Sequence, residues 1–378
     1  MNTEAFHHSC QGESHIATHK VCQDASYSAV SDSLSIAIVC DGHGGARYFR
    51  SDIGAQLAIE VTKHCVATFI QQVGDEILKG KSFTQKQAIS SEAKTNVFTK
   101  DTLVDKTLRQ LFASIIFGWR QQVAQHAQQN PLTESERLSV EPRFQQEFIA
   151  GISVEKTYGC TLMCYVATSD YWFAFQVGDG RCVAFQEDGN WCEPIPWDDN
   201  CFLNKTTSLC DSSALEEFRY CYCGDGSFPL AIFLGSDGID DSFGETENMV
   251  NFYIQVLKLI VNEGGEQALQ TITETLPQLS KIGSKDDMSV ACVYEDTSLV
   301  EHIKYLIDWQ RRYVGSAIGK VNVRIYQLQN KLRQLEAEGF DLPKRKIAYQ
   351  YAQKDLARAV EERRVLVERW YLFKRNLF

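Results

Sequence analysis

The chain has 378 residues, 44% of them hydrophobic, and a formal net charge of −11 at pH 7. This length suits two domains or one large domain with an appendage, and the hydrophobic content excludes a wholly disordered chain. No stretch reaches the roughly 20 apolar residues of a membrane helix, and residues 1–14 lack the apolar core of a signal peptide. We therefore expect no membrane partner and a cytoplasmic location.

Charge is distributed unevenly along the chain. Residues 300–378 contain 17 Lys and Arg against 9 Asp and Glu, which gives +8 and leaves −19 for residues 1–299. An acidic body fused to a basic tail suggests different roles for the two parts. The 13 cysteines include several inside apolar runs, and in a cytoplasmic chain we interpret them as reduced thiols.

The first 150 residues predict strands followed by helices. Residues 1–45 are typical of two strands around a turn, and apolar spacing predicts a helix from residue 48 to about residue 77. A loop is expected over residues 79–100. Helical spacing returns over residues 103–127, and residues 131–142 form a polar connector.

From Phe148 onward the period changes to that of strands. Residues 159–167 and 171–185 are typical of neighbouring strands joined by a short turn. Residues 191–229 look irregular, and a strand is predicted at 229–233.

The body is expected to end with helix over residues 245–279, interrupted near Gly264-Gly265, and a last strand at 288–294. Strands that flank a central helical segment without regular βαβ alternation indicate an α+β fold with antiparallel sheets.

After Asp296 the strand signal stops. Apolar residues recur at heptad spacing from Val321 to Leu335, and residues 339–343 break the helix. The sequence thus predicts two domains, a body over residues 1–296 and a basic α-helical hairpin over residues 297–378.

The basic hairpin leaves three roles open. It could dock on its own acidic body, form a coiled-coil homodimer, or bind a partner or nucleic acid. The opposite charges of tail and body favour contact with the body or with a second copy. Nucleic acid is disfavoured, because a run of charges more often forms a solvated helix face.

Four short motifs that contain aspartate each adjoin an apolar, strand-like run. They are Asp41-Gly42-His43-Gly44-Gly45, Gly178-Asp179-Gly180-Arg181, Gly235-Ser236-Asp237-Gly238 and Lys285-Asp286-Asp287-Met288-Ser289. An aspartate at a strand end is held on rigid backbone and faces an open edge of the sheet. Hard divalent cations bind several such oxygens at one point, so the four motifs together predict a metal centre.

Asp41 is the central residue of this prediction. Its carboxylate could bridge two cations, with the Gly42 carbonyl as a further ligand and with Asp237 and Asp286 completing a shell. Such an oxygen-only set favours Mg²⁺ or Mn²⁺ over Zn²⁺. Two ions about 3.5–4 Å apart would polarise a phosphoryl oxygen and create a hydroxide nucleophile near neutral pH. His43 is the predicted proton donor to the leaving alkoxide, and the alternative is a turn histidine that bonds its own loop.

The ordered set of motifs resembles the type 2C metal-dependent protein serine/threonine phosphatases, the PPM family, in a bacterial style and from about Gly12 to Tyr294. The resemblance rests on Cys22-Gln23-Asp24-Ala25, Asp41-Gly42-His43-Gly44, Gly159-Cys160-Thr161, Val177-Gly178-Asp179-Gly180-Arg181, Ser236-Asp237-Gly238-Ile239 and Asp286-Asp287-Met288-Ser289-Val290. It implies a central antiparallel β-sandwich flanked by helices, with a two-metal site in a cleft at one end. It also implies that the substrate is a phosphorylated protein.

When the family's ligand positions are carried over to this sequence, the resemblance implies that Asp41, Asp237 and Asp286 bind metal directly. Asp24 would hold a metal-bound water or the second ion, and Asp179 would belong to a third, weaker ion.

Three residues depart from the family pattern. Gln23 stands where some members carry a metal-binding glutamate, Asp287 replaces the usual asparagine, and His19 occupies the place of an arginine that binds substrate phosphate. Three nearby basic residues could substitute for that arginine: Arg181, Lys20 and His15.

Two functions are consistent with this sequence. The first is Mn²⁺- or Mg²⁺-dependent hydrolysis of phosphoserine and phosphothreonine on proteins. The second is a pseudo-phosphatase that acts as a phosphoprotein-binding or regulatory module. The presence of every expected aspartate favours the enzyme.

Overall fold

The structure is a computed structural model in which residues 2–84, 102–198, 201, 206–339 and 343–375 are described. These residues form two compact units, Met1–Glu187 with Trp191–Glu301 and Asp188–Asn190 with His302–Phe378. The first unit contains every predicted site residue. The expected domain boundary at 296/297 falls where the last strand gives way to a long helix, whereas the compact units divide at 301/302 inside that helix.

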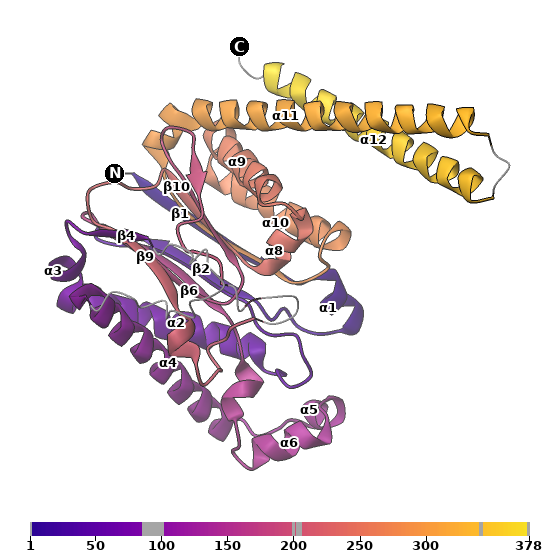
Figure 1. The fold of residues 1–378 in the computed structure, drawn as a ribbon. Coiled ribbons are helices and arrows are strands. Elements are labelled where there is room, and N and C mark those ends of the chain that lie inside the picture. The colour runs from indigo at the N-terminus through magenta and orange to yellow at the C-terminus, as the bar shows by residue number, and fades with distance from the viewer. Residues whose placement is uncertain (1, 85–101, 199–200, 202–205, 340–342, 376–378) are drawn as a thin grey trace. The chain divides into compact units, whose positions relative to one another are not determined.

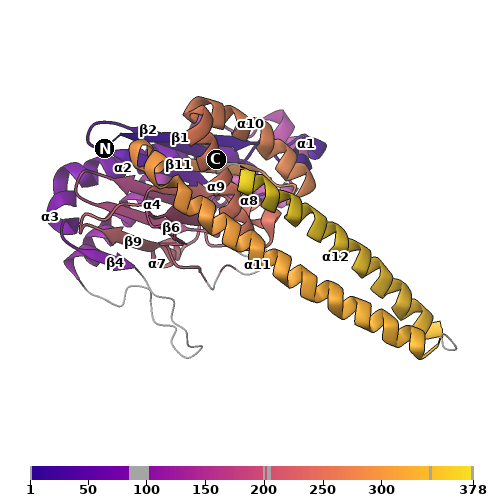
Figure 2. The ribbon, with the colours of Figure 1, turned by 90° about the horizontal axis from the view of Figure 1, so that it is seen from above.

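The core of the first unit is a pair of antiparallel sheets (Figures 1 and 2). One sheet has the strand order β1 (Thr3–Cys10), β11 (Met288–Glu295), β10 (Ala231–Gly235), β7 (Arg181–Phe185), β8 (Trp191–Cys192). The other has the order β2 (Ala25–Val30), β3 (Ser35–Cys40), β5 (Leu162–Ala167), β6 (Trp172–Val177), β9 (Arg219–Cys223), β4 (Ser82–Thr84). The prediction of an α+β fold with antiparallel sheets is confirmed.

Small and aliphatic side chains fill the space between the sheets. Among them are Ala37, Val39, Met163, Ala174, Ala184, Ile232, Leu234, Ala291 and Val293. All six residues of β3 are buried, because its other face packs against helices. A strand covered on both faces has a continuous apolar sequence, and such a run, Ile36–Cys40, directly precedes the Asp41 motif.

Helices cover the outer face of each sheet (Figure 1). The six-stranded sheet is covered by α2 (Ser51–Phe69) and α4 (Leu103–Gln129), and the five-stranded sheet by α9 (Thr246–Glu263) and α10 (Gly265–Ile282). The smaller helical segments are α1 (Glu13–Thr18), a π-helix (Ile70–Gly74), α3 (Asp75–Leu78), α5 (Glu134–Ser139), α6 (Pro142–Ile149), a 3₁₀ helix (Val154–Tyr158), α7 (Ala214–Glu217) and α8 (Asp237–Phe243). On the five-stranded side, the rings of Phe233 and Tyr253 stack with centroids 4.3 Å apart.

Several sequence predictions of local structure need correction. Residues 1–45 contain three strands, β1, β2 and β3, instead of the two that were expected. The polar connector over 131–142 contains α5, whose start is capped by Thr133. The irregular stretch over 191–229 contains β9, a buried strand between β6 and β4. Residues 171–185 are not one strand but β6 and β7, which belong to different sheets. The expected loop at 79–100 includes β4, and its remainder from residue 85 lies outside the described residues.

The second unit is a pair of long helices, α11 (Asp296–Ala337) and α12 (Pro343–Arg375). They are antiparallel, since Arg363 Nε donates to Asn322 Oδ1 at 2.7 Å while Tyr349 pairs with Glu336 nearer the turn. The predicted break at 339–343 falls mostly outside the described residues. None of the helices in the described ranges has both the length and the apolar character needed to cross a bilayer.

Arg50, the residue before α2, joins three segments of the first unit. Its side chain is 3% exposed and donates to both carboxylate oxygens of Glu136, at 2.6 and 2.9 Å. It also donates to the Asn130 carbonyl at 2.8 Å and to the Tyr158 hydroxyl at 2.9 Å. Burial alone would raise the pKa of Glu136, but the hydrogen bonds from Arg50 and Thr133 outweigh it, and the pKa is lowered.

Replacement of Glu136 by glutamine is expected to lower the free energy of unfolding by about 2 kcal/mol at pH 7, because a buried guanidinium loses its charged acceptor. Urea denaturation measures this. Glu134→Gln, an exposed change on the same helix, is the matched control and should have little effect.

The difference in the free energy of unfolding between wild type and Glu136→Gln should depend on pH in a defined direction. The folded chain lowers the pKa of Glu136, so the stabilisation is complete above the ordinary glutamate pKa of about 4.3 and is lost as the pH falls through the folded value. The difference in the free energy of unfolding between the two proteins should therefore become smaller below about pH 4. A gap that stays constant from pH 7 to pH 3 would contradict this assignment.

Candidate metal centre

The acidic motifs meet at one end of the sandwich because the strands that carry them are antiparallel. Asp24 precedes β2 and Asp41 follows β3, and the pairing of Ala25 with Cys40 places them at the same edge. In the other sheet Gly235, just before Asp237, pairs with Val290, close after Asp286. Strand pairing therefore brings distant parts of the chain to one edge of each sheet.

Asp179 reaches the same edge by a different route. It lies in the turn between β6 and β7, where the chain crosses from one sheet to the other. Gly235 also pairs with Arg181, which places this turn beside Asp237. Burial raises the pKa of the Asp179 side chain, and its interaction with Thr206 acts in the opposite direction.

Three of the carboxylates are close enough to perturb one another. The side chains of Asp41 and Asp237 share a hydrogen bond. Burial and then the neighbouring carboxylates raise the pKa of Asp41 and of Asp24. Burial is also the main cause of the raised pKa of Asp237, which reaches about 7. These three carboxyl groups therefore resist ionising together.

The residues present fit a divalent cation. Asp24 is buried, and its Oδ2 atom has no hydrogen-bond partner. Within the described part of the chain, however, no three His, Cys, Asp or Glu side chains stand close enough together for a preformed metal cluster. The two observations agree physically, because carboxylates that repel one another separate or share protons until a cation draws them together.

The Asp41-Gly42-His43 segment is fixed by a short backbone bridge to the start of β5. The Asp41 carbonyl accepts from Thr161 N at 2.8 Å, and His43 N donates to the Gly159 carbonyl at 3.1 Å. Gly42 has no room for a side chain, since a Cβ atom there would lie 2.3 Å from the Gln23 carbonyl oxygen. The bridge uses the polar groups of residues 41 and 43, which leaves the Gly42 carbonyl outside it.

Asp286 differs from the other predicted ligands in its exposure. Its side chain is exposed, and its Oδ1 accepts from the Asp287 backbone N–H at 2.9 Å. Its charge still acts on Asp237 and Asp24, whose pKa values it helps to raise. It lies at the open rim of the cluster.

Asp287 is a structural anchor for the N-terminal part of the site. Its carboxylate accepts from Gly12 N and Gln23 N, both at 2.6 Å, and contacts His15 Nδ1 at 2.9 Å. Burial acts to raise the pKa of Asp287, but the bonds to His15, Gly12 and Gln23 lower it overall. The extra negative charge at this departure from the family pattern is thus balanced within the protein.

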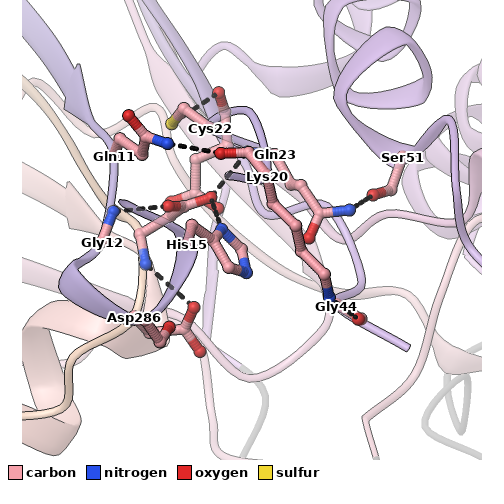
Figure 3. A network of polar contacts seen from close by, with 12 residues as sticks. Gln11, Gly12, His15, Lys20, Cys22, Gln23, Gly44, Ser51 and Asp286 are labelled. Carbon is pink, nitrogen blue, oxygen red and sulfur yellow. Dashed lines mark hydrogen bonds and ion pairs between the residues drawn. The ribbon is translucent and has the colours of Figure 1, made fainter. Parts of the chain in front are cut away.

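Gln23 also has a structural contact and one unsatisfied atom (Figure 3). Its Nε2 donates to Ser51 Oγ at 2.5 Å, while its Oε1 is buried without a hydrogen-bond partner. Lys20 reaches across the same region and donates to the Gly44 carbonyl at 3.1 Å. Two of the residues considered as substitutes for a phosphate-binding arginine, Lys20 and His15, are therefore occupied by local contacts.

His43 lies beside Tyr48, with ring centroids 4.8 Å apart. Burial lowers the pKa of His43 to about 4, with Lys156 adding to this and Asp211 opposing it. The imidazole is therefore neutral at pH 7. A proton-donating role requires that a bound phosphate dianion raise this pKa, as a neighbouring negative charge does.

The two predicted phosphate-binding residues are placed differently. Arg181 is half-buried over the ring of Trp197 and forms ion pairs with Asp240 at 2.9 Å and Glu193 at 3.2 Å. His19 is exposed at the end of α1, with a left-handed φ of 55°. The positive charge of Arg181 is already matched by two carboxylates, so a phosphate would have to compete for it.

One ion pair near His43 was not anticipated from the sequence. Lys156 Nζ lies 2.6 Å from Asp211 Oδ1, and both residues influence the pKa of His43. Lys156 belongs to the 3₁₀ helix and Asp211 to a loop 55 residues later. No local pattern marks either residue, because their relation exists only in the folded chain.

Substitution of Asp237 by asparagine is expected to raise the Tm of the metal-free chain by about 2–4 °C, since one charge is removed from a set that repels itself. The same change should reduce the additional rise in Tm that Mn²⁺ produces. Thermal unfolding with chelator and with Mn²⁺ measures both effects. Asp32→Asn, at an exposed turn between β2 and β3, is the control and should change neither. If Mn²⁺ raises the Tm of wild type and of Asp237→Asn by the same amount, Asp237 is not a ligand.

Comparison with known proteins places these motifs in a family. The sequence profile described as protein phosphatase 2C matches residues 11–274. No curated protein matches the chain.

Several solved structures are similar at low identity. PppA, described as a key regulatory component of T6SS in Pseudomonas aeruginosa, is 16% identical, with 78% of this chain and 98% of that chain covered and a TM-score of 0.43. The Mycobacterium tuberculosis serine/threonine phosphatase PstP/Ppp is 14% identical over 78% and 99%, with a TM-score of 0.43. A C. elegans sex determining protein is 15% identical over 81% and 68%, with a TM-score of 0.46.

The family match covers most of the first unit and includes Asp24, Asp41, Asp179 and Asp237. The predicted resemblance is confirmed, and with it the class of enzyme. This chain belongs to the protein phosphatase 2C family and is a protein serine/threonine phosphatase.

Proposed function

We propose that the chain hydrolyses phosphoserine and phosphothreonine in proteins at a two-metal centre that uses Mn²⁺ or Mg²⁺. Asp41, Asp237 and Asp286 would be the direct ligands, together with the carbonyl of Gly42. When bound, such ions would polarise the phosphoryl group and lower the pKa of a water molecule, which supplies the nucleophile. A third, weaker ion would belong to Asp179.

The observation that carries this proposal is the convergence of three carboxyl groups that resist ionising together. Asp24, Asp41 and Asp237 all have raised pKa values, and Asp24 Oδ2 has no partner. Such an arrangement is unfavourable in a protein unless a cation compensates it. The ligands are oxygen atoms, which supports Mg²⁺ or Mn²⁺ over softer metals.

Asp24 and Gln23 would determine how strongly the second ion binds. In place of a family glutamate, Gln23 offers a neutral Oε1 atom that is buried and unpaired. A neutral oxygen attracts a cation less strongly than a carboxylate does. We therefore expect the second ion to bind more weakly than the first and to depend mainly on Asp24.

The chain's own residues would orient substrate around this centre. His43 is the proposed proton donor to the departing serine or threonine oxygen. His19 and Arg181 are the proposed contacts to substrate phosphate. The pairing of Arg181 with Asp240 and Glu193 supports a weaker contact than a free arginine would make, so the ions would carry most of the phosphate affinity.

Hydrolysis of 4-nitrophenyl phosphate and of a phosphoserine peptide by the full chain tests the proposal. We expect turnover that requires Mn²⁺ or Mg²⁺ and stops on chelation, and a loss of about 100-fold or more in Asp237→Asn. Asp32→Asn should retain activity. A folded sample that binds Mn²⁺ and hydrolyses neither substrate would overturn the enzyme in favour of a phosphoprotein-binding pseudo-phosphatase.

The role of His43 can be separated from that of the metal ligands. A serine alkoxide needs a proton as it leaves, whereas 4-nitrophenolate is a stable anion and does not. His43→Asn should therefore lower kcat for the phosphoserine peptide by about 10²-fold or more and affect 4-nitrophenyl phosphate much less. Equal losses on the two substrates would argue that His43 holds its loop in place.

A further inference from the structure

A polar pocket of about 710 Å³ lies next to the candidate centre. It is formed by three segments of the first unit. Arg120 comes from α4, Ser153 and Lys156 come from the start of the 3₁₀ helix, and Thr206 and Asp211 come from the segment before α7.

Contacts at both ends connect this pocket to the catalytic residues. Thr207, on its wall, accepts through Oγ1 from the backbone N–H of Gly178 at 2.9 Å, next to Asp179, the proposed ligand of a third ion. Cys210, also on its wall, lies beside His43, since a methyl group placed on Gly159 would be 2.9 Å from both Cys210 Sγ and His43 Cδ2. A polypeptide whose phosphorylated residue reaches His43 would thus have a neighbouring residue at the pocket.

The Lys156–Asp211 ion pair holds one wall of the pocket to the rest of the body. Asp211 Oδ1 accepts a hydrogen bond from Lys156 Nζ at 2.6 Å, and Asp211 Oδ2 accepts one from Ser208 N at 3.1 Å. The Asp211 carbonyl accepts from Arg120 Nη2 at 2.7 Å. Both carboxylate oxygens and the carbonyl of one residue are therefore used to fix the segment before α7 against α4 and the 3₁₀ helix.

The wall of the pocket is rich in hydroxyl groups. They belong to Ser153, Ser212 and Ser213, beside Thr206 and Thr207, whose hydroxyls already bond within the protein, and the charged side chains of Arg120, Glu155, Lys156, Asp211 and Glu217 line the same wall. An apolar side chain that entered would remove water from these groups without replacing its hydrogen bonds, at a cost for each group left unpaired. A polar side chain could replace those bonds directly.

We propose that this pocket binds the residue next to the phosphorylated serine or threonine, that it selects polar side chains there, and that the Lys156–Asp211 pair positions its wall. This inference rests on the proposed function and names the class of protein segment on which that function acts: phosphorylated sequences with polar neighbours. Lys156 is a positioning residue, since it acts through Asp211.

Two phosphoserine peptides test the inference, one with serine, asparagine and glutamine around the phosphoserine and one with leucine and valine. For the full chain with Mn²⁺, kcat/KM should be about tenfold higher for the polar peptide, mainly through KM, as expected when polar groups are left unpaired. Equal kcat/KM values, or a preference for the apolar peptide, would overturn the proposal.

Variants of the ion pair test the positioning role. Lys156→Met should raise KM for the polar peptide and reduce the preference for it, and Lys156→Arg should restore most of that preference. The matched control is Lys79→Met, which breaks a 2.7 Å pair with Asp170 elsewhere on the body and should leave the preference intact. A Lys156→Met chain that loses activity equally on both peptides and on 4-nitrophenyl phosphate would show a merely structural role.

Binding separates failure of this inference from failure of the enzymatic function. Fluorescence anisotropy with peptides that carry a non-hydrolysable phosphonate in place of the phosphate reports affinity without turnover. Tighter binding of the polar peptide, weakened in Lys156→Met, supports the pocket even if wild type hydrolyses nothing. Hydrolysis of 4-nitrophenyl phosphate together with equal binding of the two peptides would retain the enzyme and reject the pocket.

Discussion

Repulsion among neighbouring carboxylates is the constraint on which the candidate site depends. Asp24, Asp41 and Asp237 come from three different strand ends, where Asp24 is buried and Asp41 and Asp237 are partly exposed. A chain that needed only stability would not keep three such groups together, because each raises the cost of ionising the others. The sandwich supplies the rigidity that holds them in place, with the bridge between Asp41 and Thr161 on one sheet and the pairing of β10 with β11 on the other.

Around this cluster the protein balances charge with short, local contacts. Asp287 is matched by two backbone N–H groups and His15, and Arg181 is matched by Asp240 and Glu193. The carboxyl groups that raise one another's pKa values are thus proposed ligands, whereas the charged groups of Asp287 and Arg181 beside them are paired.

The sequence predicted those parts of the structure that have local signals. The Asp-Gly motifs at strand ends were recognisable, as were the long helices and the break between α9 and α10 at Gly264. The capping pattern from Thr133 to Glu136 was also present in the sequence, and it marks a helix that was interpreted as a connector.

Other features had no signal in any short window. Strand β9 is short and rich in Cys and Tyr, and it becomes a strand because β6 and β4 pair with it on both sides. The Lys156–Asp211 contact and the neutral state of His43 follow from packing between distant segments. The proposed metal ligands could therefore be named from the sequence, whereas their partners required the fold.

The Asp287 anchor joins Gly12 to a residue 275 positions later, and β1 pairs with β11 over a similar separation. During synthesis, β1 and the loop before β2 must wait for nearly the whole body to leave the ribosome before their partners exist. The emerging polypeptide therefore cannot assemble a working phosphatase early, and activity arises only as a late event of folding.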